Sequence, residues 1–206
     1  MLFPAVVLLT DTLRLAPAPG PIRFDGLVSV AEYGAPSLAI AIPGGQARLW
    51  LRRAGDAVYV AAFIPDSTPS WMDDLVISLD TGGDRATAPQ HDDFQWYFRR
   101  VLDSSVVLRG EQGAWRVPRD DPDWRLGSVR EGGGWEVRSE STARGWSLEL
   151  RLDAAYFTEA RGRLPGIAFR IFDNEPQGWF TWPAPAGLAQ PVELERRPDR
   201  WAAVSP

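Results

Sequence analysis

Short apolar runs separated by turn-forming residues extend along most of the chain. Its 19 glycines and 18 prolines punctuate these runs, and no segment shows the apolar period of a long amphipathic helix. Brief apolar runs bounded by such residues are typical of β-strands. The pattern predicts strands at Ala47–Leu51, Ala57–Ile64, Leu75–Leu79, Phe94–Arg100, Ser105–Arg109, Trp135–Ser139, Trp146–Leu152, Ile167–Phe172, Trp179–Trp182 and Pro191–Glu195.

Two of these runs indicate how the strands are covered. In Trp146–Leu152 the large apolar residues alternate with polar ones, so we expect one face of this strand, including Glu149, to be solvated. Ala57–Ile64 is apolar on both faces, which indicates a central strand covered on both sides. After the first of these runs, Asp153–Phe157 is expected to form one helical turn, with Asp153 as its N-cap.

Composition narrows the class of protein. A chain of 206 residues with 45% hydrophobic residues fits one large all-β domain, residues 1–206, better than two small domains or a disordered segment. The net charge of −5 argues against nucleic acids and anionic membranes as partners, because phosphate binding requires clustered positive charge. The absence of cysteine excludes disulfides and thiolate metal sites. A single histidine, His91, excludes a multi-histidine metal site and a histidine relay.

The N-terminal residues have two interpretations. Ala5–Leu15 is expected to be a first strand or, alternatively, a trimmed export signal. Residues 16–21 are rich in proline and are expected to connect this segment to the rest of the domain. No stretch of the chain reaches the roughly 18 apolar residues of a transmembrane helix, so we expect no insertion into a membrane.

Six short motifs follow one another along residues 22–196. They are Phe24-Asp25-Gly26-Leu27-Val28 with Glu32-Tyr33, Ala57-Val58-Tyr59-Val60-Ala61-Ala62 with Pro65-Asp66, Trp71-Met72-Asp73-Asp74, the run Leu75–Asp80, Gly145-Trp146-Ser147-Leu148-Glu149, and Gly166-Ile167-Ala168-Phe169 with Asp173 and Trp182. Each motif alone has little specificity. Their order and spacing resemble those of family 9 carbohydrate-binding modules and their DOMON-like relatives.

This resemblance implies an all-β fold, a two-sheet antiparallel β-sandwich with long loops and at most short helical turns. It implies a non-catalytic module that binds carbohydrate and is secreted, periplasmic or part of the cell envelope, as a monomer or an appendage of a larger protein. In the family the sugar is held between two tryptophans at one end of the sandwich. The matching residues are Trp71 and Trp182, with Trp179 as the alternative to Trp182. The competing interpretation is that these rings close the end of the core.

A polar row is predicted on the strand after the acidic segment. Alternation places Phe94, Trp96 and Phe98 on one face and Gln95, Tyr97 and Arg99 on the other. An amide, a phenol and a guanidinium suit a ligand rich in hydroxyl groups. In the resembling family an arginine and an asparagine on this strand contact sugar, so the side chains differ here. The alternative is a solvated face or one of ion pairs between strands.

Acidic residues gather around the glycines that follow Leu79. Asp80, Asp84, Asp92 and Asp93 are candidate ligands for calcium, which takes six to eight oxygen ligands. The family resemblance also implies structural calcium, although the domain would require no other cofactor. The alternative is turn chemistry, because aspartate and glycine favour turns in any case.

Three further functions are weighed against sugar binding. The first is a structural or interaction module of an envelope protein, for which Trp50 would supply exposed apolar surface beside two arginines. The second is a DOMON-type haem domain, whose axial ligands would be Met72 and His91. The third is a glycoside hydrolase, which needs two carboxylates flanking a cleft, but no spacing of glutamates marks such a pair.

Overall fold

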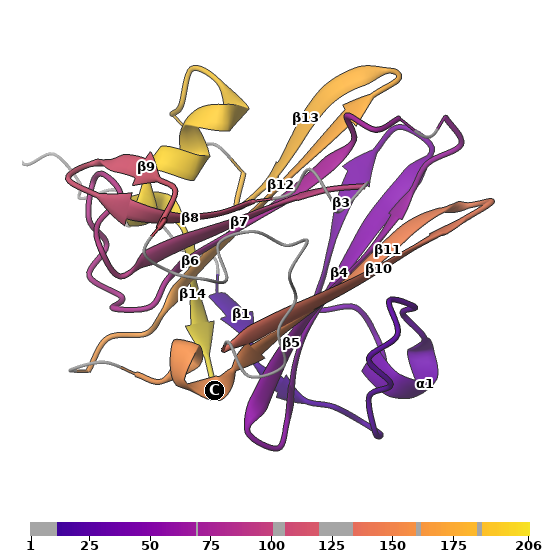
Figure 1. Ribbon diagram of the computed structural model, residues 1–206, viewed down its shortest axis with the longest axis horizontal. Coiled ribbons are helices and arrows are strands. Elements are labelled where there is room, and N and C mark those ends of the chain that lie inside the picture. Colours follow the sequence, from indigo (N-terminus) through magenta and orange to yellow (C-terminus); the bar gives the residue numbers. More distant parts are fainter. Residues whose placement is uncertain (1–11, 69, 101–105, 120–133, 160–161, 185–186) are drawn as a thin grey trace, which may run out of the picture.

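Two β-sheets pack face to face around one hydrophobic core (Figure 1). The computed structural model describes residues 12–68, 70–100, 106–119, 134–159, 162–184 and 187–206. Within these residues the first sheet has the strand order β1-β14-β12-β6-β7-β8-β9, with β13 paired to β12. Its strands are β1 (Thr12–Arg14), β6 (Asp74–Asp80), β7 (Asp93–Arg99), β8 (Val106–Glu111), β9 (Ala114–Arg116), β12 (Gly166–Asn174), β13 (Gln177–Trp182) and β14 (Ala202–Ser205).

The second sheet has the order β10-β11-β5-β4-β2, with β3 also paired to β4. Its strands are β2 (Ala16–Pro17), β3 (Leu38–Ile42), β4 (Gly45–Ala54), β5 (Ala57–Pro65), β10 (Trp135–Thr142) and β11 (Gly145–Asp153). Nearly all pairs are antiparallel. The parallel ones among the described residues are the short pairs β1–β14 and β2–β4. The predicted β-sandwich is therefore confirmed.

All but one of the predicted runs overlap strands. Pro191–Glu195 does not, because residues Pro191–Arg196 form the 3₁₀ helix η4. Proline at the start of this segment favours a helical turn, and only Leu194 of its side chains is buried against the sheet. The expected turn after β11 is present as the 3₁₀ helix η3 (Ala154–Phe157), with the Asp153 carboxylate accepting a hydrogen bond of 2.8 Å from the Ala155 amide.

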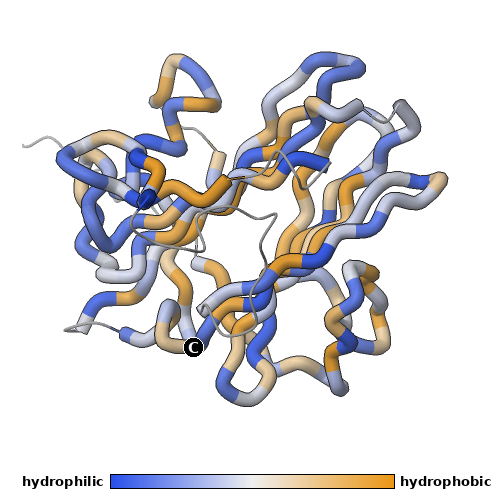
Figure 2. Tube along the Cα trace, viewed as in Figure 1, coloured by the Kyte–Doolittle hydropathy of each residue, from blue (hydrophilic) through white to orange (hydrophobic). Residues whose placement is uncertain are grey.

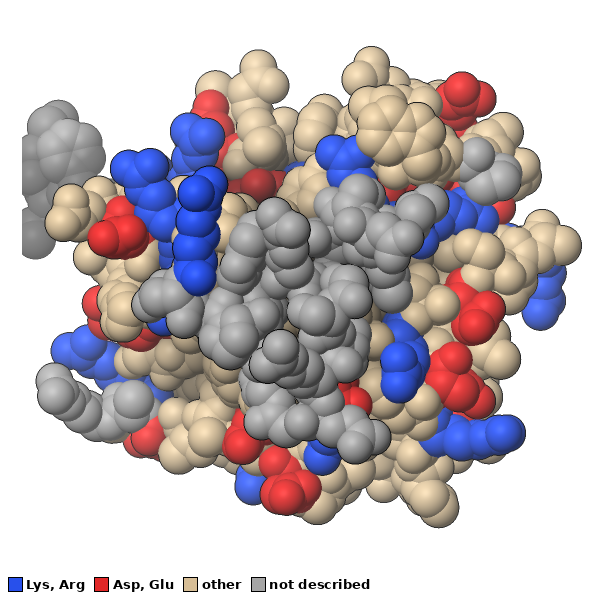
Figure 3. All heavy atoms as spheres, viewed as in Figure 1, with Lys and Arg blue, Asp and Glu red and all other residues tan. Residues whose placement is uncertain are grey.

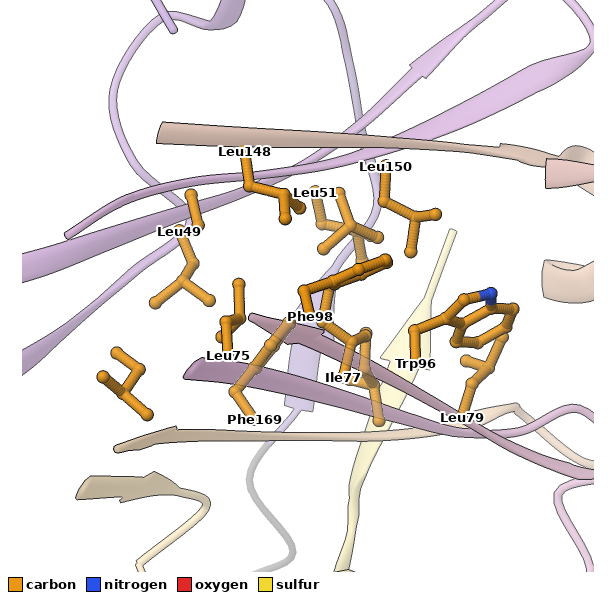
Figure 4. Close-up of a cluster of buried hydrophobic side chains, with 14 of the residues drawn as sticks. Leu49, Leu51, Leu75, Ile77, Leu79, Trp96, Phe98, Leu148, Leu150 and Phe169 are labelled. Carbon is orange, nitrogen blue, oxygen red and sulfur yellow. The ribbon is translucent and has the colours of Figure 1, made fainter. Parts of the chain in front are cut away.

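The core lies where the inward faces of the two sheets meet. Leucines of β4 and β11 point toward side chains of β6, β7 and β12, as the close-up in Figure 4 shows. Trp96 and Phe98 of β7 are completely buried between the layers. Figure 2 shows the hydrophobic positions concentrated on the strands that face each other. The alternation read from the sequence placed these residues on the inward face correctly.

The outward face of the second sheet is covered by the chain itself, which the alternation did not predict. Residues 22–37, with the short helix α1 (Val30–Tyr33), lie across β4, β5 and β11 on the side away from the core (Figure 1). Consequently Glu149 is 0% exposed and Trp50 is 3% exposed. The expectations that Glu149 is solvated and that Trp50 supplies exposed apolar surface are wrong. The central position of Ala57–Ile64, covered on both sides, is confirmed.

The N-terminal expectations are tested only in part. Residues 1–11 lie outside the described residues. Thr12–Arg14 forms β1 beside β14, and Ala16–Pro17 then joins the second sheet beside β4, so the proline-rich connector crosses between the layers. None of the helices in the described residues is long and apolar enough to span a membrane.

Candidate functional site

A cluster of charged and aromatic side chains lies on the outward face of the first sheet. Asp74 of β6, Tyr97 of β7 and Arg170 of β12 point to this face because their neighbours in sequence point into the core. Asp74 accepts hydrogen bonds from Arg170 Nη1 at 2.7 Å and from the Tyr97 hydroxyl at 2.6 Å. Arg170 Nε donates to Glu195 of η4. Arg170 is thus held between two carboxylates.

Burial determines the electrostatics of this cluster. The side chains of Arg170 and Asp74 are 3% and 1% exposed. Burial raises the pKa of Asp74 above its ordinary value, and the neighbouring Arg170 opposes that rise only in part. Burial and the Asp74 carboxylate both raise the pKa of the Tyr97 hydroxyl. The phenol therefore stays protonated at neutral pH and donates to Asp74.

Guanidinium groups and aromatic rings alternate across this face. The guanidinium carbon of Arg99 lies 5.1 Å from the ring centroid of Trp71 and 5.7 Å from that of Tyr97. The guanidinium carbon of Arg170 lies 5.4 Å from the Tyr97 centroid and 4.5 Å from that of Trp179. These are cation–π distances. We call the row Trp71–Arg99–Tyr97–Arg170–Trp179 the cation–π ladder.

The two tryptophans at the ends of the ladder are its solvent-exposed parts. Trp71 is 62% exposed and Trp179 is 42% exposed. Behind Trp179 lies the Phe172 ring, with the two ring centroids 4.4 Å apart. Exposed large aromatic surface on a folded domain is expected where a ligand or partner binds.

A buried cluster of ion pairs holds the loop that carries Trp71. Arg100 pairs with Asp66, and its Nη1 lies 3.6 Å from Asp73 Oδ2. The Asp73 carboxylate also accepts a 3.2 Å hydrogen bond from the backbone N–H of Asn174, a residue of the β12–β13 hairpin that carries Trp179. This buried ion cluster therefore fixes the loop of one exposed tryptophan against the hairpin of the other.

Two of the sequence-predicted ligand residues lie outside the ladder. Trp182 is half-buried and packs against the core, with its ring centroid 6.1 Å from that of Phe169. Gln95 is 2% exposed beneath η4, where its amide contacts Ser78 and Glu195 at 3.4 Å. Trp71, Tyr97, Arg99 and Trp179 are the predicted residues that the structure brings together.

The sequence interpretation missed the residues that hold the ladder. Arg170 and Asp74 could have been found, because each is a charged residue directly beside an inward-pointing apolar residue of its strand. No comparable signal marks Glu195. It comes from a 3₁₀ helix that the apolar pattern predicted to be a strand.

The acidic residues at the other end of β6 form a compact group. One carboxylate oxygen from each of Asp80, Asp84 and Asp92 lies within 4.8 Å of the others. Asp93, opposite Asp80 on β7, is 0% exposed, and its Oδ1 has no hydrogen-bond partner among the described residues. Burial raises the pKa of Asp93 to about 8, and the carboxylate of Asp80 adds to that rise. The three converging oxygens of Asp80, Asp84 and Asp92 fit a hard cation such as calcium, whereas the predicted ligand Asp93 lies outside this group.

The proposed haem ligands are far apart. Met72 precedes β6 and His91 precedes β7, and these strands are antiparallel, so the two residues lie at opposite ends of the strand pair. Strands of this length span about 20 Å at 3.3–3.4 Å per residue. The two side chains therefore cannot ligate one iron, and the expectation that they would be the axial ligands of a haem is wrong.

Comparisons with known proteins agree with this architecture. No protein-family model matches the chain, and no curated protein matches it. Among solved structures, a family 9 carbohydrate-binding module from Caldicellulosiruptor kristjanssonii in complex with cellotriose superposes with a TM-score of 0.58 at 16% identity, covering 95% of this chain and 93% of that one. A family 9 module from the same organism in complex with glucose gives 0.57 at 17% identity, covering 93% and 94%. The fold is therefore that of a family 9 carbohydrate-binding module.

Proposed function

We propose that this domain is a non-catalytic carbohydrate-binding module whose ligand binds at the cation–π ladder. The observation that carries the proposal is the pair of exposed indoles, Trp71 and Trp179, at the two ends of an anchored row of hydrogen-bonding side chains. The similarity of the fold to modules in complex with cellotriose and glucose supports a β-linked glucan or its sugar units as the first ligands to test.

The chemistry of the ladder suits a sugar. The flat C–H face of a pyranose ring packs on an indole, while its hydroxyl groups need planar donors and acceptors around the rim. Arg99 lies between the rings of Trp71 and Tyr97 and presents a guanidinium with several N–H donors. Arg170 and Asp74 are buried and bonded to each other, so their role is to orient Tyr97 and Trp179.

Two further features belong to the proposal. Calcium bound by Asp80, Asp84 and Asp92 would neutralise the acidic group at the end of β6 that lies away from Asp74. Its role would be structural, since the ladder contains Tyr97 and Arg99 from the opposite end of β7. A secreted, periplasmic or envelope location is part of the proposal, because a polysaccharide ligand would be found outside the cytoplasm.

The test is calorimetric titration with glucose, cellotriose and a panel of soluble polysaccharides. Replacing Trp71→Ala or Trp179→Ala removes one stacking surface and is expected to weaken binding about tenfold, or about 1.4 kcal/mol. Trp182→Phe is the matched control, because Trp182 lies on the opposite face of β13 and should leave the affinity within twofold.

Absence of binding to every sugar in the panel would contradict the proposal. So would sugar binding that both tryptophan replacements leave unchanged. In that case the exposed rings would be better explained as a contact surface for a protein partner.

A further inference from the structure

A cavity lies on the outward side of the second sheet, away from the cation–π ladder on the first sheet. Its volume is about 450 Å³, which falls within the usual range for small-ligand pockets of roughly 300–1,000 Å³. It is bounded by Val28 and Val30 of the covering segment and by Phe63 and Pro65 of β5. The cavity is thus formed where residues 22–37 stop covering the outward face of the second sheet.

The polar side chains in this cavity, apart from the indole of Trp50, are two arginines. Arg48 comes from β4 and Arg144 from the β10–β11 turn, and none of the lining residues is acidic. Among the described residues, no carboxylate lies within ion-pair distance of either guanidinium. In a chain with a net charge of −5, two arginines without a carboxylate partner in one apolar cavity indicate a site for an anion.

Aromatic surface forms the floor beneath the arginines. The guanidinium carbon of Arg48 lies 5.0 Å from the ring centroid of Phe63 and 6.0 Å from that of Trp50. Phe63 is half-buried, while Trp50 is almost completely buried and donates its indole N–H to the Gly34 carbonyl at 3.0 Å. The Trp50 hydrogen bond is therefore already satisfied, and Phe63 supplies the ring surface that the floor offers to a ligand.

Among the described residues, the exposed large apolar side chains form two groups, and one further residue stands alone. Trp71, Met72 and Trp179 mark the ladder and the loop beside it, and Val192 stands alone on η4. The remaining two are Leu27 and Val30, which both belong to the covering segment, and Val30, 70% exposed, lines the cavity. Apolar surface left open to water in this way is a second observation, independent of the arginines, that points to a ligand.

We infer that this cavity binds a small aromatic monocarboxylate. The carboxylate would accept hydrogen bonds from Arg48 and Arg144, since a guanidinium matches a carboxylate in geometry and charge. The aromatic ring would pack against Val30, Phe63 and Pro65. A uronic acid has the same charge but carries ring hydroxyls, and apart from the two arginines and the already bonded Trp50 indole the walls contain no polar side chain to satisfy them. This inference stands apart from the proposed sugar site.

The test is a titration of the ¹⁵N-labelled protein with cinnamate and benzoate, followed by amide chemical shifts. We expect saturable shifts at Val28, Val30 and Phe63 in the millimolar range or below. Arg48→Gln and Arg144→Gln should each weaken cinnamate binding at least fivefold. Arg53→Gln, an exposed arginine of the same strand outside the cavity, is the matched control and should leave binding unchanged.

Comparison ligands separate the parts of the inference. Benzyl alcohol, which lacks the charge, and glucuronate, which lacks the aromatic ring, should bind at least tenfold more weakly than cinnamate. Glucuronate binding as tightly as cinnamate would overturn the assignment of an aromatic ligand, and absence of saturable shifts with either aromatic acid would overturn the site. The replacements Trp71→Ala and Trp179→Ala should leave cinnamate binding intact, so a failure of this inference is distinguishable from a failure of the sugar proposal.

Discussion

Glu149 is the buried carboxylate that holds the covering segment on the second sheet. Its Oε2 accepts hydrogen bonds from the amides of Gly26 at 2.6 Å and Asp25 at 2.9 Å, and its Oε1 accepts one from the Tyr33 hydroxyl at 2.6 Å. Gly26 has φ +88, and a Cβ there would lie 3.0 Å from the backbone of Ser139, so the segment fits closely against β10. The three donors belong to residues 22–37, and the acceptor belongs to β11.

Replacing Glu149→Leu leaves these donors without an acceptor. The Gly26 amide and the Tyr33 hydroxyl are buried, and each unsatisfied buried donor costs about 1–3 kcal/mol. The Asp25 amide is only partly buried and can turn to water. Relief from burying a charge offsets part of the loss, so we expect the free energy of unfolding to fall by about 3 kcal/mol. Urea denaturation measures this change, and hydrogen exchange of the Gly26 amide should accelerate.

Glu149→Gln is the control, because an amide keeps most of these bonds without the charge. Its oxygen can accept from both backbone amides while its nitrogen donates to the Tyr33 hydroxyl oxygen. Only the Tyr33 hydroxyl hydrogen then lacks an acceptor, and removal of the buried charge offsets part of that cost, so we expect a change of about 1 kcal/mol. If Glu149→Leu were equally mild, residues 22–37 would be held by apolar packing alone and the reasoning about this carboxylate would be refuted.

The same pair of variants gives a pH test. Burial raises the pKa of Glu149 above its ordinary value of 4.5. The folded protein therefore holds this proton more tightly than the unfolded chain, and ionisation of Glu149 lowers stability as the pH rises above 4.5. The glutamine variant lacks this contribution. Its stability relative to the parent should increase as the pH rises above 4.5, and a difference that is independent of pH would contradict the buried ionisation.

Three further predictions concern the first sheet. Trp182→Ala should lower the free energy of unfolding by about 3 kcal/mol, because its ring packs on Phe169 in the core, and thermal denaturation should show the loss while sugar binding persists. Arg170→Met should cost about 3–5 kcal/mol by leaving Asp74 buried without its cation, and Asp74→Leu in the same chain should recover most of that loss in urea denaturation. Calcium at 100 times its Kd should stabilise the domain by about 2.7 kcal/mol, which thermal denaturation would show as a rise in Tm. The Asp92→Asn variant should not show this rise. An equal rise in the variant would show that the metal binds elsewhere.

The alternation of apolar and polar residues predicts strands and faces well but cannot predict what covers a face. Ser147 and Glu149 alternate with leucines as in a strand open to water, yet both bond to the covering segment more than 110 residues away in sequence. The burial of Trp50 against Tyr33 has the same cause. Contacts between such distant segments leave no periodic signal in either one.

The choice between Trp179 and Trp182 shows a second limit. Alternation along β13 places the two rings on opposite faces, but it does not say which face is inward. The pairing with β12 decides this, because Trp182 lies opposite the buried Phe169 and Trp179 lies opposite Phe172 on the outward side. Register between strands is a tertiary property, so the sequence left both rings as candidates.

The buried charges beneath the ladder are better explained by positioning than by stability. A buried ion pair such as Asp74–Arg170 contributes little net stability relative to an apolar pair of similar volume, because desolvation offsets the attraction. What the pair does is orient rings, since Arg170 lies against Trp179 and Asp74 fixes the Tyr97 hydroxyl. The double replacement Asp74→Leu with Arg170→Met should therefore fold nearly as stably as the parent and yet bind sugar more weakly. Equal sugar affinity would mean that the cluster serves the fold rather than the site.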